Sequence, residues 1–419
     1  MGALALVVLL LLPHGLLRAD TIEGTNGTVM SGKVVARDEK FLTVEITVAG
    51  KPAQRKIPLS MVKAVTVDGK REVLNGPGAG QPATPGKPAA GADGAAARTR
   101  PQVEALIAAA ATPPEWFEST PLNLPKSLDL SWPEKPQGPW NNQKNVGQFI
   151  WDVVNPNPNR WREGVKLMHH LMEQNKVDRE LQMRASASIA GIYHHLLQDY
   201  ARAAHWFRKA GNRQDAVGLA ECYWKLGNKQ MAVELLSGLR SIPPAAIKLW
   251  ADMGETAKAV QLSDLFAKGG SADVGYLYAA DALRLAGRYK EALAYYNRVL
   301  AVPDDKRNKH NKDRARGAIE AIQLFDTLDL AKVVDGAHTA STLGYEGPIE
   351  VEVNIAGGRI AAVRVTKHKE KQFYAALTDT PAKIIAKQSV KGIDATSRAT
   401  ITSEAIITAT AKALQSGTK

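Results

Sequence analysis

Apolar and polar residues alternate over residues 20–74, and turn-forming residues interrupt the pattern at short intervals. The segments VMSGKVVAR, KFLTVEITVAG, QRKIPLS and KAVTVDG have the period-two pattern of strands and are separated by Gly, Asp-Glu and Gly-Lys turns. Four or five such strands within about fifty residues are typical of a small closed sheet. The pattern therefore predicts an SH3-like or Sm-like β-barrel at 20–74.

The stretch 75–101 consists almost entirely of Gly, Ala, Pro and small polar residues. Such a composition cannot form a core, so a flexible linker is predicted. Residues 102–160 are irregular and rich in Pro and Trp. We expect the aromatic rings to tether extended segments to a helical surface, with stacking on a sugar or base as the alternative. The tryptophans concerned are Trp116, Trp132, Trp140, Trp151 and Trp161.

A helical pattern with an internal repeat dominates the region 102–330. Small residues recur at spacings of 29, 27 and 33 positions, where two helices could approach closely. The residue four positions after each is expected to fill the next layer of side chains between the helices. The small residues are Ala203, Ala232, Ala259 and Ala292, and their followers are Phe207, Leu236, Ser263 and Tyr296. Gly227, Gly254 and Gly287 stand five residues before an alanine and open the turn between two helices. The frame resembles the tetratricopeptide repeat (TPR), with its best copy at 278–303, and predicts a helical-hairpin solenoid that docks a protein partner.

Strand-like alternation returns near the C-terminus. The alternating apolar positions are Ile349, Val351, Val353 and Ile355. They predict a strand with one buried face, and the pair Gly357 and Gly358 predicts a hairpin turn into a second strand. Helices are predicted around 380–389 and at 404–415. Residues 331–419 are therefore predicted to form an α+β domain, and the whole chain a multidomain α+β protein.

Hydroxyl groups are concentrated in DATSRATITSEAI, residues 394–406, directly before the last predicted helix. Ordinary capping needs one hydroxyl, whereas this segment holds several. The free N–H groups and positive dipole end of a helix N-terminus attract anions, so Thr400, Thr402 and Ser403 are candidates for a phosphate site. The alternative is a simple N-cap, with Thr402 or Ser403 beginning the helix and Thr400 satisfying a turn.

Several motifs of the C-terminal region occur in a recognisable order. The order is DG…GYEGPIEVEV…GGRIAAVRVTKHKE…QS…IDATSRATITSEAI…AL, over roughly 333–415. It resembles the FMN-binding domain of the covalent-flavin family, as in the flavin subunits of sodium-pumping NADH:quinone reductase and of Rnf-type complexes. The resemblance implies an α+β domain with FMN as its cofactor. It covers about a fifth of the chain and implies nothing about residues 1–330.

In that family the FMN phosphate is esterified to a Thr in the motif D-x-x-S/T-G-A-T/S. A separate flavin transferase attaches it outside the cytoplasm, using FAD and a divalent metal. Asp394, Ser397, Ala399 and Thr400 match this motif, so the resemblance implies Thr400 as the acceptor. The sequence departs from it at Arg398, where the family has Gly. Gly permits positive φ and close approach, which Arg does not adopt easily; an alternative is that Arg398 pairs with the phosphate of unesterified FMN.

The resemblance also assigns residues outside the hydroxyl-rich segment. Gly344, Tyr345 and Gly347 are expected to shape a loop near the isoalloxazine ring. His368 and Glu370 match the H-x-E that follows the second strand in the family. They are expected either to contact the flavin or to cap the strand end.

The N-terminus carries an apolar run, Ala3–Leu12, that is shorter than the about 20 residues needed to span a bilayer. Together with a plausible cleavage point after Ala19 it predicts a signal peptide at 1–19. A retained membrane anchor is the alternative. Either interpretation places the remainder of the chain outside the cytoplasm, in the periplasm or cell envelope.

Charge and cysteine content narrow the range of functions. The net charge is +12, but Lys and Arg are scattered and no zinc-finger spacing occurs, so nucleic acid is not an expected partner. The single Cys222 lies in a helical apolar pattern typical of packing. The pairs His169-His170 and His194-His195 each point about 100° apart on a helix, so neither forms a metal site alone. No P-loop, catalytic triad or Rossmann motif is present, which favours an electron carrier over a self-contained enzyme.

Two functions of different classes follow. The first is an exported FMN-binding flavoprotein that shuttles electrons with a redox partner, soluble or membrane-bound, and docks it through the helical repeats. The second is a cell-envelope scaffold in which the flavin domain is degenerate, as the departure at Arg398 suggests. A weaker third option is that the domain passes electrons to a catalytic domain in a partner chain.

Overall fold

The computed structural model divides the chain into two compact units, Met1–Gly86 and Lys87–Lys419. The described residues are 20–24, 29–38, 40–48, 51–67, 70–74, 97–136, 138–325 and 327–418. The predicted signal peptide 1–19 and residues 75–96 of the predicted linker lie outside them. None of the helices in the described part of the chain has the length and apolar character needed to cross a bilayer.

The first unit is an antiparallel sheet of six strands in the order β4-β3-β2-β1-β5-β6. The strands are β1 (Asp20–Gly24), β2 (Val29–Arg37), β3 (Phe41–Val48), β4 (Lys51–Pro58), β5 (Val62–Val67) and β6 (Lys70–Val73). Its core is formed by Ile22, Leu42, Val44, Val62 and Val65, which are all nearly inaccessible to solvent. The strand pattern of the sequence is thus confirmed, with six strands rather than four or five. The order leaves β4 and β6 at its ends, so closure into a barrel stays a prediction.

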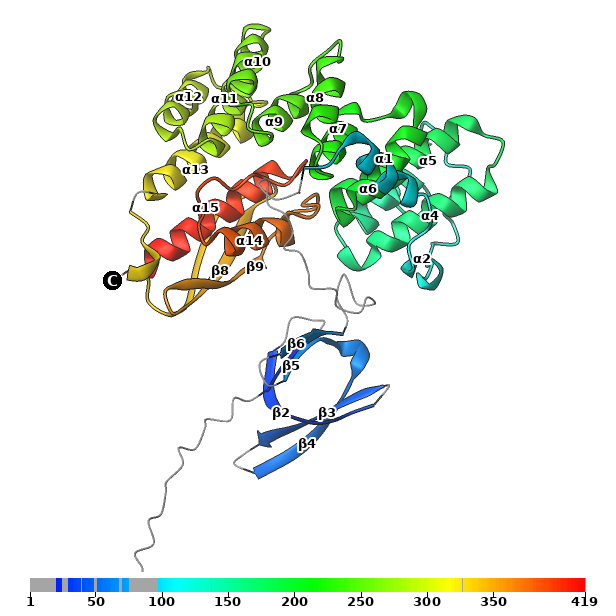
Figure 1. The fold of residues 1–419 in the computed structure, drawn as a ribbon, viewed down its shortest axis with the longest axis vertical. Coiled ribbons are helices and arrows are strands. Elements are labelled where there is room, and N and C mark those ends of the chain that lie inside the picture. The colour runs from blue at the N-terminus through cyan, green and yellow to red at the C-terminus, as the bar shows by residue number, and fades with distance from the viewer. Residues whose placement is uncertain are drawn as a thin grey trace, which may run out of the picture. The chain divides into compact units, whose positions relative to one another are not determined.

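The second unit begins with a long run of helices whose neighbours in sequence pack on one another (Figure 1). The helices are α1 (Arg100–Ala109), α2 (Trp116–Ser119), α3 (Val146–Phe149), α4 (Trp161–Gln174), α5 (Arg179–Gly191), α6 (Tyr200–Lys209), α7 (Ala216–Lys225), α8 (Lys229–Ser237), α9 (Pro244–Asp252), α10 (Thr256–Lys268), α11 (Ala272–Leu285), α12 (Tyr289–Ala301) and α13 (Lys309–Phe325). We call α1–α13 the helical region.

The repeated small residues lie where helices approach closely. Ala203, Ala232, Ala259 and Ala292 are all fully buried. Gly227, Gly254 and Gly287 follow the ends of α7, α9 and α11 and have φ of +93°, +82° and +73°. In that left-handed region an L side chain is strained, so Gly is the suitable residue for these turns. The structure therefore explains the spacing by packing, while membership of the TPR family stays a prediction.

The tryptophan cluster divides into two groups. Trp132 and Trp161 are buried and Trp116 packs against the same core, as the tethering interpretation requires. Trp140 and Trp151 are exposed. The indole N–H of Trp140 donates to Asp152 at 2.7 Å, so part of this ring is held by a local hydrogen bond.

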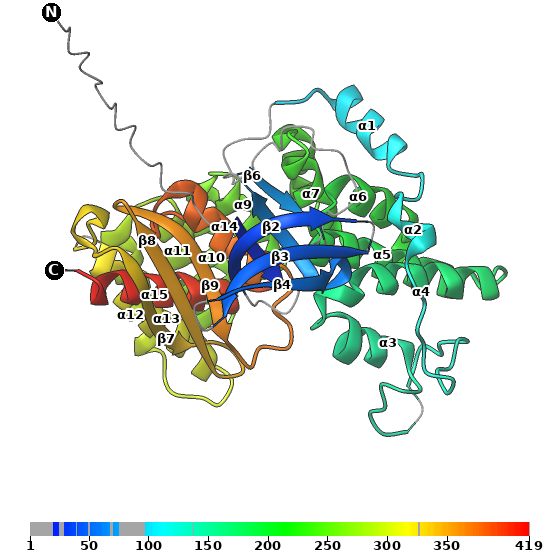
Figure 2. The same cartoon turned by 90° about the horizontal axis from the view of Figure 1, so that it is seen from below.

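The C-terminal part is a three-stranded antiparallel sheet in the order β7-β8-β9, packed against two helices (Figure 2). The elements are β7 (Gly336–Leu343), β8 (Pro348–Ala356), β9 (Arg359–Lys367), α14 (Ala376–Lys387) and α15 (Thr400–Ser416). The predicted strand is confirmed in β8, because Ile349, Val351, Val353 and Ile355 are buried. Gly357 and Gly358, both at positive φ, form the expected hairpin turn. The β7 strand was not predicted, because it consists mainly of small and polar residues.

The last helix begins earlier than predicted, at Thr400 instead of 404. It packs against β7, β8 and α13. One apolar cluster joins Leu277 and Leu283 of α11, Phe325 of α13 and the inward residues of β8 and α15. The C-terminal domain therefore completes its core with the last helices of the helical region.

We expect Gly287→Ala to lower the free energy of unfolding by about 1 kcal/mol, because Ala is strained at positive φ. Gly317 in α13 is the matched control, since an added β-carbon meets no atom within 4 Å at either position. Gly317→Ala is expected to raise the free energy of unfolding by about 0.5–1 kcal/mol, because Ala favours a helix interior. Urea unfolding followed by circular dichroism measures both. Effects of the same sign would contradict the argument.

Candidate functional site

The loop between α14 and α15 is held by buried charges. Lys383 of α14 bridges Asp379 at 2.8 Å and Asp394 at 3.1 Å, and Lys225 of α7 lies 3.8 Å from Asp394. Burial alone would raise the pKa of Asp394, but Lys225 and Lys383 outweigh this and hold its pKa below the usual value. Asp394 thus has a structural role in this arrangement, because its negative charge is paired with lysines of the protein.

A cluster of hydroxyls lies beneath this loop. Thr396 donates its hydroxyl to Asp379 at 2.6 Å. The Ser403 hydroxyl accepts from the Thr396 backbone N–H and from the Thr380 hydroxyl, each at 3.0 Å. Ser403 is fully buried, so it ties the first turn of α15 to α14 and does not face a ligand. Thr396 and Thr380 were not singled out from the sequence. They meet Ser403 only because α14 and the loop after it pack against α15, and no local sequence pattern predicts that packing.

Arg398 adopts the backbone conformation that Gly takes more easily. Its φ is +63°, in the left-handed region. Arg398 thus takes up the conformation that the family's Gly permits, at the cost of about 1–2 kcal/mol that a non-Gly residue pays there. Its guanidinium donates to the Asp215 carboxylate of the helical region at 2.6 Å, which compensates part of the cost. The loop thus keeps the backbone shape that a Gly would permit.

Ser397 is bound to the helical region as well. Its hydroxyl donates to Glu221 of α7 at 2.6 Å, and Glu221 also lies 3.2 Å from His194. Burial alone would raise the pKa of Glu221, but the charge interaction with His194 holds it well below the usual value. The ring nitrogens of His194 and His195 are 2.8 Å apart. Within the described residues no group of His, Cys, Asp and Glu is arranged to hold a metal ion.

Thr400 is the first residue of α15 and is half-buried. The preceding residue, Ala399, occupies the N-cap position and offers no side chain to the first-turn N–H groups. The N-cap alternative for Thr402 or Ser403 is therefore wrong, because both residues lie inside the helix. An uncapped first turn with its dipole end free is an arrangement that suits an anion.

The space beside Thr400 is small. It is a cavity of about 30 Å³, lined from the helical region by α9 and α11 and from the C-terminal domain by Ile393, Asp394, Ala395, Thr400 and Glu404. That volume holds about one water molecule. Organic ligands usually occupy cavities of about 300–1,000 Å³.

Glu370 joins α15 to the loop between β7 and β8. It is buried, accepts from the Thr402 hydroxyl at 2.7 Å and accepts from the backbone N–H of Glu346 at 2.9 Å. These contacts tie the segment after β9 to α15 and to the β7–β8 loop, and both predicted roles stay predictions. His368 lies against the Phe373 ring, with centroids 5.3 Å apart.

The residues Gly344, Tyr345 and Gly347 form the β7–β8 loop. Gly344 is buried, and a β-carbon there would lie 2.6 Å from the Glu370 carboxylate and 2.7 Å from Ile349. Tyr345 is 51% exposed, and its ring stacks on His310 of the helical region at 4.8 Å. The ring of Tyr345 is therefore accessible for contact with another aromatic group.

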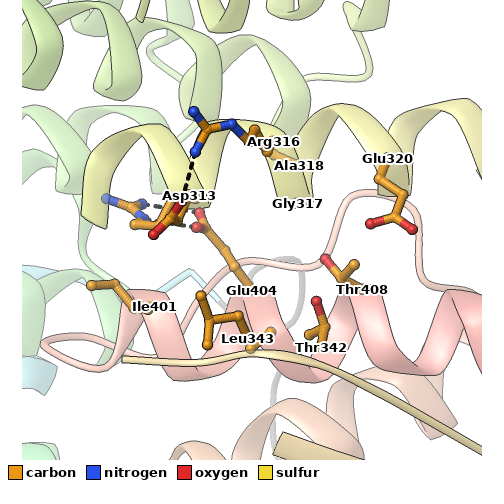
Figure 3. A pocket seen from close by; sticks show the side chains of 12 residues that line it. Asp313, Arg316, Gly317, Ala318, Glu320, Thr342, Leu343, Ile401, Glu404 and Thr408 are labelled. Carbon is orange, nitrogen blue, oxygen red and sulfur yellow. Dashed lines mark hydrogen bonds and ion pairs between the residues drawn. The ribbon is translucent and has the colours of Figure 1, made fainter. Parts of the chain in front are cut away.

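A larger hollow of about 240 Å³ lies between α13 and α15 beside the end of β7 (Figure 3). Charged pairs line it: Arg314 donates to Glu404 at 2.9 Å, and Arg316 donates to Asp313 at 2.7 Å. Leu343, which precedes Gly344, forms part of its wall. Glu404 lines both this hollow and the small cavity beside Thr400, so its buried side chain lies between the two.

We expect Gly344→Ala to lower the free energy of unfolding by about 1–3 kcal/mol, because the new methyl group would displace Glu370 and Ile349 from close packing. Gly347 is the matched control in the same loop. An added β-carbon there would meet only the flexible Lys369 side chain, at 3.4 Å, so Gly347→Ala should change stability by less than about 0.5 kcal/mol. Thermal unfolding of the two variants checks this, and equal shifts would refute the close-packing argument.

Comparison with known proteins bears on the C-terminal domain. Residues 344–415 match the family model of the FMN-binding domain. An uncharacterized protein of Treponema pallidum (strain Nichols) is 42% identical over 87 residues, a match that covers 20% of this chain and 24% of that protein. The chain thus matches about a quarter of that relative's length, and no solved structure gives a significant match. FMN is therefore the cofactor of the C-terminal domain, and the cavity beside Thr400 does not accommodate it in the arrangement described.

Proposed function

We propose that this protein is an exported FMN-binding flavoprotein that carries electrons between protein partners, with FMN esterified to Thr400. The observation that carries the proposal is the backbone around Thr400. Arg398 holds the left-handed conformation at +63°, and α15 begins at Thr400 without a side-chain cap. A loop of this shape leaves the first-turn N–H groups of a helix available to an anion beside a hydroxyl.

An ester is favoured over an ion pair with the phosphate. Arg398 is the residue that would pair with an unesterified phosphate, but its guanidinium already donates to Asp215. Asp394 is likewise paired with lysines. Thr400, the motif residue at the helix start, is half-buried and carries a hydroxyl. A separate flavin transferase would attach the cofactor.

The electron-carrier role rests on the cofactor, whose redox chemistry needs no further catalytic motif in the chain. Bound FMN supplies the redox chemistry, and the protein would position it. We assign partner docking to the helical region, because helical repeats of this kind present extended binding surfaces. Export rests on the apolar N-terminal run of the sequence.

One observation favours the alternative of an envelope scaffold. The cavity beside Thr400 measures about 30 Å³, which is too small for FMN. A domain that carries no flavin would be expected to have such a filled site. The two functions differ in whether the purified chain contains flavin.

We expect the chain, produced in an exporting host that contains a flavin transferase, to carry one covalent flavin. Thr400→Ser should retain it, because the hydroxyl is preserved, whereas Thr400→Ala should lose it. Intact mass and flavin fluorescence of the denatured protein measure the adduct. An adduct that persists in Thr400→Ala would reject Thr400 as the acceptor, and no adduct in any chain would favour the scaffold.

A further inference from the structure

We propose that Trp140 and Trp151, together with the Asp152 carboxylate that links them, form a binding site for a neutral glycan chain. The site lies in the segment 138–155, outside the residues that match the FMN-binding family. It is independent of the flavin and of the electron-carrier role proposed above.

Trp140 and Trp151 are exposed, at 61% and 46%. In contrast, Trp132, Trp161 and Trp206 are at most 8% exposed and pack in the core of the helical region. Core packing therefore does not account for the first two rings. A large flat ring at the surface offers a partner a large area for stacking.

The ring of Trp140 is held in a fixed orientation. Its indole N–H donates to Asp152 Oδ2 at 2.7 Å, and the Asn142 amide donates to the same oxygen at 3.2 Å. The N–H lies in the plane of the indole, so this bond orients the ring without covering its faces. Because Asp152 follows Trp151 directly in the chain, the bond also brings the two exposed rings to one part of the surface. A site that is ordered before its ligand arrives loses little entropy on binding.

The backbone under Trp151 is anchored as well. Trp151 belongs to a π-helix, Ile150–Val154, a rare conformation that is frequent at functional sites. Its carbonyl accepts from the Gln372 amide at 3.0 Å, and the Gln372 side chain accepts from Asn155 at 3.2 Å. These bonds join the π-helix to the segment that follows β9.

The charge of the segment 138–155 favours an uncharged ligand. Lys144 is its one cation and Asp152 its one anion. Nucleic acids and anionic lipids are recognised by clusters of Lys and Arg, which this segment lacks. The half-buried carboxylate beside Trp140 would also repel a phosphate group.

The hydrogen-bonding groups favour a sugar over an apolar surface. Asp152 Oδ2 accepts from Trp140 and Asn142, whereas Asp152 Oδ1 accepts no hydrogen bond within the described part of the chain. Gln143 extends the polar network through its bond to Asn142 at 3.2 Å. A pyranose ring presents C–H groups on its faces, which stack on an indole, and hydroxyls at its edge, which donate to a carboxylate. Both kinds of contact are available at this site.

Single substitutions separate the stacking from the hydrogen bond. Trp140→Ala and Trp151→Ala each remove one ring, whereas Trp140→Phe keeps a ring and removes the N–H that bonds Asp152. Leu265→Ala is the matched control, because Leu265 on α10 is 57% exposed and lies outside the segment. Since all these positions are exposed, circular dichroism should show the same fold for every chain.

The full chain is applied to an array of immobilised neutral oligosaccharides built from hexoses and N-acetylhexosamines. Calorimetry then measures the dissociation constant for the sugar that binds best. We expect each alanine variant to bind about tenfold more weakly than wild type, which corresponds to about 1.4 kcal/mol for one lost stacking contact. Trp140→Phe should bind about threefold more weakly, because its ring is no longer fixed. Leu265→Ala should bind as wild type does.

Failure of the wild-type chain to bind any neutral sugar on the array would overturn the glycan site. Equal affinity of the wild type and both alanine variants would overturn it as well, because the sugar would then bind elsewhere. Binding to heparin or single-stranded DNA that the alanine variants lose would assign the rings to a polyanion and reject the neutral ligand. None of these results bears on flavin content, which tests the proposed function separately.

Discussion

The buried carboxylate of Glu404 determines where the last helix lies. It pairs with Arg314 of α13 at 2.9 Å and with Arg284 of α11 at 3.3 Å. Burial alone would raise the pKa of Glu404, but the two guanidinium groups outweigh this effect and hold its pKa below the usual value. Removing one partner of a buried pair costs about 3–5 kcal/mol, so positions of α15 in which Glu404 lacks an arginine partner are disfavoured. Thr400, one turn earlier, is placed against the helical region as a consequence.

Local periodicity was sufficient to predict the regular elements with one clearly buried face. The β8 strand, its Gly-Gly turn and the buried alanines of the helical region all follow from spacing alone. The β7 strand was missed because GAHTASTL lacks large apolar residues and its side chains are at most half-buried. The start of α15 was placed late because Thr and Ser disfavour helix interiors, whereas here buried partners satisfy their hydroxyls.

The motif residues could be identified from the sequence, but their surroundings could not. Asp215 and Glu221 carry no pattern that connects them to Ser397 and Arg398, because the contacts join segments far apart in the chain. Glu404 was passed over for the same reason. The family resemblance covers only the C-terminal domain. It therefore could not predict that the helical region packs against the motif residues.

The departure at Arg398 and the contact of this residue with the helical region are best understood as one feature. A Gly would give the loop its left-handed turn without a side chain to fasten it, whereas Arg398 adopts the same turn and reaches Asp215. The strain costs about 1–2 kcal/mol and a half-exposed ion pair contributes about 0–1 kcal/mol, so the substitution stabilises the chain little or not at all. A contact whose contribution and cost nearly cancel is poorly suited to strengthening a fold. Its effect is on position, because it fixes the loop before α15 against the N-cap residue of α7.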